Sequence, residues 1–210
     1  YAQGKWRPLL ADAESDYGSA RALAKSIIDD LEPHRGIPSD KMGKLSPFEQ
    51  YERVMAGEDH LWCGNIAAIF SYACNALGIP CRQIGMHYPW PPDPKEGYRV
   101  LLAEGHGTTE IFSESLNQWI WMDLTFYILG AYLREEGPIN MVELYKFLND
   151  PNRVKGLCIV EYDSATKMEN VVPLMESRKK QSLFNYFKRD QQFRYSKRDA
   201  ADSVKIKCET

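Results

Sequence analysis

The run from Cys63 to Leu77 is the feature of this sequence that most constrains its fold. Apolar side chains recur in this run at steps of three and four residues, which is the period of an α-helix; they are Ile66, Ile69, Phe70, Ala73 and Leu77. Few polar residues interrupt the run, so the helix is predicted to be central rather than peripheral. Gly78 followed by Pro80 ends it sharply.

The periodicity of the sequence changes after this helix. Residues 82–86, 98–112 and 119–125 are rich in Ile, Val, Leu, Tyr, Phe and Trp, which is typical of β-strands. Loops are predicted between them, over 89–97 and 113–117. We predict that these strands are sequential and antiparallel, with a further strand over 157–162.

Three more helices are predicted on either side of the strands. One covers 17–31, where Leu23, Ile27 and other apolar residues recur at helical spacing before Pro33 and Gly36. A second begins after Ser46 with a capping box and a proline at its first position, and runs to about Met55. A third covers 140–147 and has the same capping pattern. Helices followed by a meandering sheet and another helix favour an α+β fold over a parallel α/β fold.

Length and composition limit the class of protein. A chain of 210 residues can bury roughly 70% of its extended surface in one domain. No apolar run approaches the ~20 residues of a membrane-spanning helix, so no integral membrane span is expected. Aromatic residues make up 12% of the chain, which excludes collagen, coiled coil and wholesale disorder. The chain begins at Tyr1 rather than Met, so its location in the cell stays open.

Charge divides the chain into a body and an extension. Residues 176–210 hold 10 Lys and Arg against 5 Asp and Glu, whereas residues 1–175 hold 16 against 24. We therefore predict an acidic body that does not bind nucleic acid, and a basic extension. The segment 182–195 of the extension mixes aromatic and cationic residues. Its aromatics are predicted to dock on the body; binding to a partner or a membrane surface is the alternative.

The cysteines do not form a metal or redox motif. They are Cys63, Cys74, Cys81, Cys158 and Cys208, and no two of them stand in a C-x-x-C pair. A zinc ribbon or a thioredoxin-type motif is therefore not indicated. Because the number is odd, at least one thiol stays unpaired within the chain. The sequence does not show whether the compartment is oxidising.

Cys63 stands where a nucleophile would be activated. It lies at the predicted N-terminus of the central helix, where the positive helix end lowers a thiol pKa and free amides can hold an oxyanion. His106 in the next long strand is a candidate base, and Asp123 in the strand after that is a candidate orienting acceptor. The plainer interpretation is a packed cysteine, a hydrogen-bonding histidine and a turn-forming aspartate.

Three segments resemble the transglutaminase-like superfamily, which is related to the papain-like cysteine proteases. Cys63-Gly-Asn-Ile-Ala-Ala-Ile-Phe70 and Ala76-Leu-Gly-Ile-Pro-Cys-Arg82 are similar to its nucleophile helix and the turn that follows. Gly105-His-Gly-Thr-Thr-Glu-Ile-Phe112 is similar to its histidine strand, and Trp119-Ile-Trp-Met-Asp-Leu-Thr125 to its aspartate strand. The match covers about residues 60–126, in the family order Cys, His, Asp.

The resemblance implies a fold, a site and an activity. The fold would be a papain/transglutaminase-like core in which the nucleophile helix packs on an antiparallel sheet, within a catalytic domain over residues 1–175. Cys63, His106 and Asp123 would be the catalytic triad, acting on a peptide or protein amide without a cofactor or metal. Hydrolysis is favoured over crosslinking, and Arg82 is expected to be a structural ion-pair partner. The proline-rich segment 88–94 could form a wall of the substrate cleft or a stiff surface connector.

Two departures from the family pattern leave an alternative open. Thr108 stands where the family often has Trp, and no residue clearly matches the side chain that supplements the oxyanion hole. His60, Trp62 and Gln50 are the candidates for that role. The alternative is a degenerate module that binds a peptide, a glycan or a protein partner. A third hypothesis is a zinc site formed by His60, Cys63, His106 and Asp123, all of which are competent zinc ligands.

Overall fold

The computed structural model describes residues 1–87, 105–134, 136–187, 192–195 and 204–206 as a mixed α+β fold. The α-helices are α1 (Ala2–Lys5), α2 (Asp16–Leu31), α3 (Pro47–Met55), α4 (Cys63–Ala76), α5 (Met141–Leu148) and α6 (Lys180–Tyr186). The strands are β1 (Cys81–His87), β2 (Gly105–Ser113), β3 (Gln118–Met122), β4 (Ile128–Leu133), β5 (Leu157–Asp163), β6 (Met168–Pro173), β7 (Gln192–Tyr195) and β8 (Val204–Ile206). One sheet has the order β3-β2-β1-β7-β8, and a second has the order β4-β5-β6.

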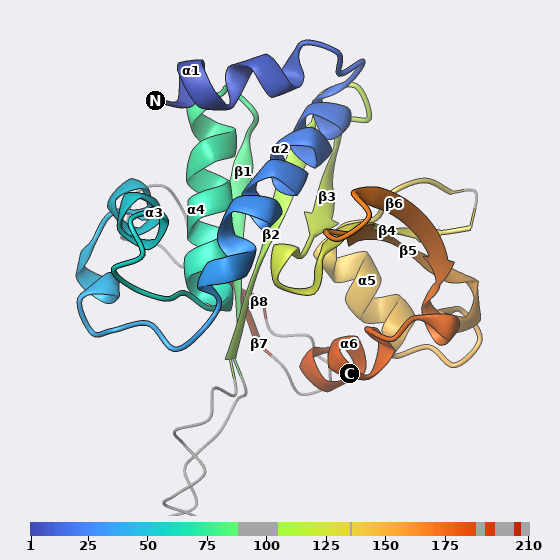
Figure 1. Ribbon diagram of the computed structural model, residues 1–210. Helices are drawn as coiled ribbons and strands as arrows, with labels where there is room; N and C mark the ends of the chain where they lie inside the picture. Colours follow the sequence, from blue (N-terminus) through green and yellow to red (C-terminus); the bar gives the residue numbers. More distant parts are fainter. Residues whose placement is uncertain (88–104, 135, 188–191, 196–203, 207–210) are drawn as a thin grey trace, which may run out of the picture.

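Helix α4 is the central helix that the sequence predicts. It packs against β1 and β2, with α2 and α3 beside it (Figure 1). Its apolar stripe is buried from Ile66 to Cys74. Gly78 follows the helix at φ +87°, a conformation that suits glycine and ends the helix. The prediction of a buried helix ended at Gly78 is confirmed.

The flanking helices are also confirmed, and their caps explain their boundaries. α3 begins after Ser46, whose side chain accepts from the Glu49 amide while the Glu49 carboxylate accepts from the Ser46 amide. α5 begins after Asn140, which makes the same reciprocal pair of hydrogen bonds with Glu143. Each such box satisfies amides that have no partner within the helix. The short α6, in contrast, carries no side-chain cap and was not predicted.

The predicted strands are confirmed over their described parts, with one correction. β1, β2 and β3 are sequential and antiparallel, as expected. The predicted continuation of β3 to Thr125 is wrong, because the Asp123 carboxylate accepts from the amides of Thr125 and Phe126 and bends the chain into a 3₁₀ turn over Leu124–Phe126. β4 and β6 were not predicted. Residues 98–104 of the predicted second strand and the loop over 89–97 lie outside the described residues.

The larger sheet separates two hydrophobic clusters. Successive residues of β3 alternate between them: Ile120 and Met122 join the cluster under α2, α3 and α4, whereas Trp121 joins the cluster under β4, β5, α5 and α6. This is the two-residue period of a strand that is buried on both faces. The core therefore places α4 on one side of the sheet and α6 on the other.

The basic extension contributes to the second cluster. Leu183 and Phe187 are buried there, and the Phe187 carbonyl accepts from the Asn149 side chain at 3.0 Å. β7, further along the extension, pairs with β1. The described residues after 176 therefore contact the body, while the boundary at 175 stays a prediction.

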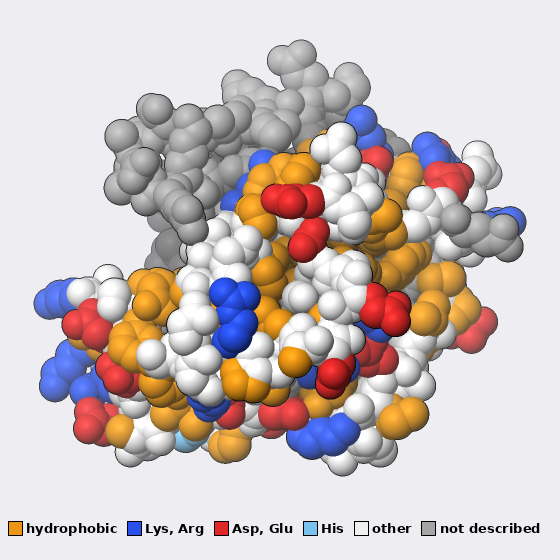
Figure 2. Space-filling view, turned by 90° about the horizontal axis from the view of Figure 1, so that it is seen from above, with side chains coloured by type: hydrophobic (Ala, Val, Ile, Leu, Met, Phe, Trp, Pro, Cys, Tyr) orange, Lys and Arg blue, Asp and Glu red, His pale blue; other side chains and the backbone are white. Residues whose placement is uncertain are grey.

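The face of the molecule shown in Figure 2 carries charges of both signs. In the space-filling view, acidic and basic side chains are interspersed among apolar ones rather than separated by sign (Figure 2). None of the described helices combines the length and apolar character needed to traverse a bilayer. The distribution of charge on the face shown in Figure 2 therefore does not single out a binding surface.

Candidate active site

Helix α4 and the β2-β3 hairpin bring the three predicted site residues together. Cys63 is the first residue of α4, His106 is the second residue of β2, and Asp123 follows the last residue of β3 directly. Cys63 is half-buried, whereas His106 is only 4% exposed and Asp123 is fully buried. Three residues that span sixty positions of the sequence thus come together at the start of one helix.

The three side chains form one polar cluster. His106 Nε2 lies 2.6 Å from Asp123 Oδ2. The His106 side chain also lies close enough to the Cys63 thiol for each group to shift the pKa of the other. Because Nε2 is engaged by Asp123, the other ring nitrogen, Nδ1, is the one available to the thiol. A thiol, an imidazole and a carboxylate in this order can act as a nucleophile, its base and the group that orients the base.

The turn after β3 holds the Asp123 carboxylate in place. Asp123 Oδ1 accepts from the Thr125 amide at 3.0 Å and the Phe126 amide at 3.3 Å, which leaves Oδ2 for His106. Arg35, after the end of α2, donates to the Thr125 carbonyl at 2.9 Å and to the Leu124 carbonyl at 3.1 Å. Arg35 therefore fixes the turn from outside. The sequence analysis missed Arg35, since no local pattern connects it to a turn ninety residues later.

The start of α4 lies almost against the backbone of β2. A Cβ atom added to Gly107 would lie 2.9 Å from Gly64 Cα, so only glycine allows this approach. The Gly107 amide also helps to lower the pKa of the Cys63 thiol. From β1, Gln83 Nε2 donates to the Gly64 carbonyl at 3.1 Å. The glycine after His106 was a visible signal of this contact, whereas Gln83 carried none.

The electrostatics of the cluster favour a charged pair. Burial raises the pKa of Cys63, but the hydrogen bond and the charge of His106 together with the Gly107 amide outweigh it and lower that pKa below its usual value. Burial lowers the pKa of His106, but the charge and hydrogen bond of Asp123, aided by Cys63, raise it to about 10. Both shifts act in the same direction, toward a thiolate beside an imidazolium. By contrast, burial raises the pKa of Cys74, a core thiol.

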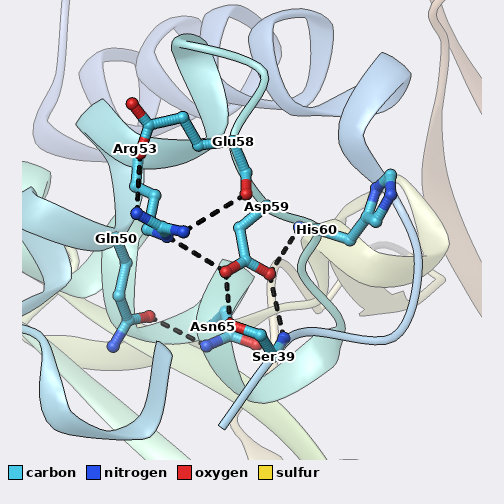
Figure 3. A network of polar contacts seen from close by, with 7 residues as sticks. All are labelled: Ser39, Gln50, Arg53, Glu58, Asp59, His60 and Asn65. Carbon is cyan, nitrogen blue, oxygen red and sulfur yellow. Dashed lines mark hydrogen bonds and ion pairs between the residues drawn. The ribbon is translucent and has the colours of Figure 1, made fainter. Parts of the chain in front are cut away.

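A second polar network supports the chain just before Cys63 (Figure 3). The Asp59 carboxylate accepts from the Ser39 amide at 2.9 Å, the Ser39 hydroxyl at 2.5 Å, Arg53 Nε at 3.0 Å and the His60 amide at 2.9 Å. These hydrogen bonds, those of Ser39 above all, hold the pKa of Asp59 well below its usual range. The network ties the residues around Ser39 to the turn that leads into α4.

Gln50 joins the first turn of α4 to the same region. Its Oε1 accepts from Asn65 Nδ2 at 2.9 Å, and its Nε2 donates to the Leu45 carbonyl at 2.9 Å. Asn65 Oδ1 in turn accepts from the Trp62 amide at 3.3 Å. Gln50, one candidate for the oxyanion donor, is therefore engaged in holding the helix start. Of the other two candidates, the His60 ring points away from Asp59 in Figure 3, and the Trp62 side chain is exposed.

The remaining expectations concern Arg82, metals and the other thiols. Arg82 Nη2 lies 2.6 Å from the buried Glu110 carboxylate, so Arg82 is an ion-pair partner, as expected. In the described parts of the chain, no group of three or more His, Cys, Asp or Glu side chains is arranged to hold a metal ion. The described cysteines are free thiols. Cys208 and the proline-rich segment 88–94 lie outside the described residues.

Comparison with protein-family models, with curated proteins and with solved structures finds no match to this chain. The site is therefore interpreted from its own geometry. That geometry is a half-buried thiol at a helix start, linked through a buried imidazole to a buried carboxylate. In chemical terms, such an arrangement can supply a nucleophile and can return a proton to a leaving group.

Proposed function

We propose that this protein is a thiol-dependent acyl-transfer enzyme that acts on amide or peptide bonds, with hydrolysis favoured over crosslinking. The observation that carries the proposal is the cluster at the start of α4, in which His106 lies 2.6 Å from Asp123 and lowers the pKa of the Cys63 thiol. A structural cysteine needs neither a charged base beside it nor a buried carboxylate behind that base. The papain/transglutaminase-like core belongs to the same proposal and is supported by the position of α4 against an antiparallel sheet.

Each group has a defined step in the proposed reaction. The Cys63 thiolate attacks the carbonyl carbon of the amide, and the carbonyl oxygen becomes an oxyanion. Amides at the start of α4, including that of Cys63, lack acceptors within the helix and can stabilise this oxyanion. The His106 imidazolium gives its proton to the leaving amine, which departs as the C–N bond breaks. A thioester between Cys63 and the acyl group remains.

The second half of the reaction releases the acyl group. Neutral His106 accepts a proton from water as the water oxygen attacks the thioester carbonyl, and the C–S bond breaks. The products are a carboxylic acid and the regenerated thiolate-imidazolium pair. Asp123 holds the ring and stabilises its cationic form throughout. An amine in place of water would give a new amide, which is the crosslinking outcome.

The first experiment asks whether Cys63 is an activated thiol. We expect iodoacetamide to alkylate Cys63 at pH 6–7, and mass spectrometry of the digested protein to locate the label. The Cys63→Ala variant should lose this labelling and keep its fold. Cys158→Ala is the matched control, since Cys158 is also half-buried but lies on β5 with no histidine partner in the described contacts. Labelling that is unchanged in Cys63→Ala would reject Cys63 as the nucleophile.

A second experiment identifies the bond and the acceptor. A mixture of unfolded proteins is incubated with the enzyme and a dansylated primary amine. New carboxyl groups would indicate hydrolysis, and incorporated dansyl label would indicate amine transfer. Neither product should form with Cys63→Ala. If neither forms with the wild type while Cys63 is alkylated rapidly, amides of this kind are not the substrate.

One observation favours the alternative of a degenerate binding module. Gln50, one candidate for a side-chain oxyanion donor, already bonds to Leu45 and Asn65. The site would then depend on backbone amides alone, and the fold would serve to hold a peptide, glycan or protein partner. A Cys63 thiol that titrates near the ordinary value of about 8.5 would favour this module over the enzyme.

A further inference from the structure

The His106 imidazole is in contact with two aromatic rings. Phe126, from the turn after Asp123, stacks on it with ring centroids 5.0 Å apart and planes inclined by 29°. Tyr186, from α6, stacks closer, at 4.5 Å and 28°. The centroids of Phe126 and Tyr186 are themselves 5.8 Å apart. The three rings thus form one cluster, and its closest member comes from the basic extension rather than from residues 60–126.

Helix α6 is anchored so that Tyr186 is held at this position. Leu183 and Phe187, three residues before Tyr186 and one after it, are buried in the second hydrophobic cluster. The Phe187 ring meets Trp121 edge-on, with centroids 5.8 Å apart. Burial and the charges of Cys63 and Asp123 raise the pKa of Tyr186. Because the residues before and after Tyr186 are buried in the core, its ring has little freedom to move away from His106.

We propose that Tyr186 is a positioning residue of the Cys63 site, stacking on His106 and stabilising the ring in its protonated form. The inference rests on the proposed acyl-transfer function. An aromatic face within about 6 Å attracts a cation, and the attraction grows when both groups are shielded from water. The imidazolium that Cys63 and Asp123 require is such a cation. Residues 60–126 then contain the reacting groups, but an extension residue is needed to complete their environment.

The experiment compares two substitutions that separate the aromatic face from mere bulk. Tyr186→Phe keeps the ring and loses the hydroxyl, whereas Tyr186→Leu keeps apolar volume and loses the ring face. The protonation midpoint of His106 is followed by the ¹³C and ¹⁵N shifts of its ring against pH. The His106 signal is assigned by its absence in His106→Gln. Phe184→Leu, in the same helix and packed on the same cluster, is the matched control.

We expect the midpoint of Tyr186→Phe and Phe184→Leu to equal that of the wild type, and that of Tyr186→Leu to fall by about one pH unit. A midpoint in Tyr186→Leu equal to that of the wild type would overturn the role of Tyr186. An equal fall in Tyr186→Phe and Tyr186→Leu would overturn the stacking argument, since the hydroxyl would then be responsible.

The wild-type measurement separates failure of this inference from failure of the proposed function. If His106 and Cys63 of the wild type both titrate near their ordinary values, about 6.5 and 8.5, the proposed function fails and the role of Tyr186 falls with it. If the wild-type pair is charged at neutral pH and the His106 midpoint of Tyr186→Leu equals that of the wild type, only the role of Tyr186 is overturned.

Discussion

Two buried carboxylates in this protein have similar geometry and different chemistry. Asp123 and Asp59 each cap a turn by accepting backbone amides, and each accepts from a basic side chain as well. The basic partner of Asp123 is an imidazole, His106, whereas that of Asp59 is a guanidinium, Arg53. An arginine does not release its proton in a protein, so Arg53 cannot pass a proton along the network of Asp59. An imidazole can release its proton, so His106 can exchange a proton with the neighbouring Cys63 thiol.

The comparison teaches that a cluster of titratable groups is reactive only if one member can change state. Around Asp59, the side-chain donors are Ser39 and Arg53, and Arg53 also pairs with the Glu58 carboxylate at 2.6 Å. The described contacts of this network include no thiol and no imidazole ring. Around Asp123, the chain ends at a half-buried thiol whose pKa is lowered. The first network holds the approach to α4, and the second supplies the proposed chemistry. The predictions below test that division.

The largest effect is expected from the same substitution made at the two carboxylates. Asp123→Asn should lower the acyl-transfer rate roughly 10³- to 10⁴-fold, because the amide cannot stabilise an imidazolium or select its tautomer. Asp59→Asn should leave the rate within about tenfold of the wild type and lower the urea midpoint of unfolding instead. Rates of Cys63 acylation or alkylation, set beside urea titrations, provide the measurement. Equal loss of rate in both variants would contradict the division.

Gly107→Ala should affect both stability and reactivity. The new Cβ would meet the Gly64 backbone at 2.9 Å, so the helix start has to move. We expect a loss of about 1–3 kcal/mol in the free energy of unfolding, typical of overpacking, with slower alkylation of Cys63. Gly64→Ala serves as the control, since no atom lies within 4 Å of a Cβ added there. Equal rates and stabilities in both variants would rule out the close approach as the cause.

The two networks should respond to opposite ends of the pH range. The pKa of His106 is raised to about 10 in the folded protein, so its contribution to stability is present below pH 6.5 and is lost as pH rises toward 10. The pKa of Asp59 is lowered, so its contribution is present above about pH 4 and is lost as pH falls further. Urea titrations of His106→Gln and Asp59→Asn against pH test this.

The pH experiment needs a background in which the thiol does not titrate. The pKa of Cys63 is lowered, so its own contribution appears as pH rises and opposes that of His106. Cys63→Ala removes this term from both comparisons. In that background, the loss in free energy of unfolding caused by His106→Gln should shrink as pH rises above 7. A loss that grows instead would contradict the raised pKa of His106.

The smallest effect is expected at Gln50, and it decides between two roles. If Gln50 only joins Leu45 to Asn65, Gln50→Ala should cost about 1 kcal/mol of stability and less than tenfold in rate. A side-chain oxyanion donor would behave differently, losing 10²- to 10³-fold in turnover with little change in stability. Asn65→Ala, which removes the partner, should match Gln50→Ala in the first case. Turnover and thermal unfolding measured together distinguish the two.

Local patterns predicted the helices and the meander because their causes are local. Capping boxes at Ser46 and Asn140 depend on residues three positions apart. The failure at Thr125 has a local cause too, since a carboxylate can compete with the strand by capping its own turn. Arg35 and Gln83 were missed because their partners are backbone carbonyls far along the chain, and any residue provides a carbonyl.

The amino-acid sequence by itself determined the central helix, the antiparallel succession of β1, β2 and β3, and the three residues proposed to react, because periodicity and residue chemistry are properties of single segments. Tertiary structure alone decided that Asp123 would accept from His106 at 2.6 Å, that Gly107 would admit the helix start, and that Tyr186 would cover the imidazole. These contacts join residues with no common spacing. They exist because two faces of one sheet are buried at the same time, which brings α4 and α6 to opposite sides of the same strands.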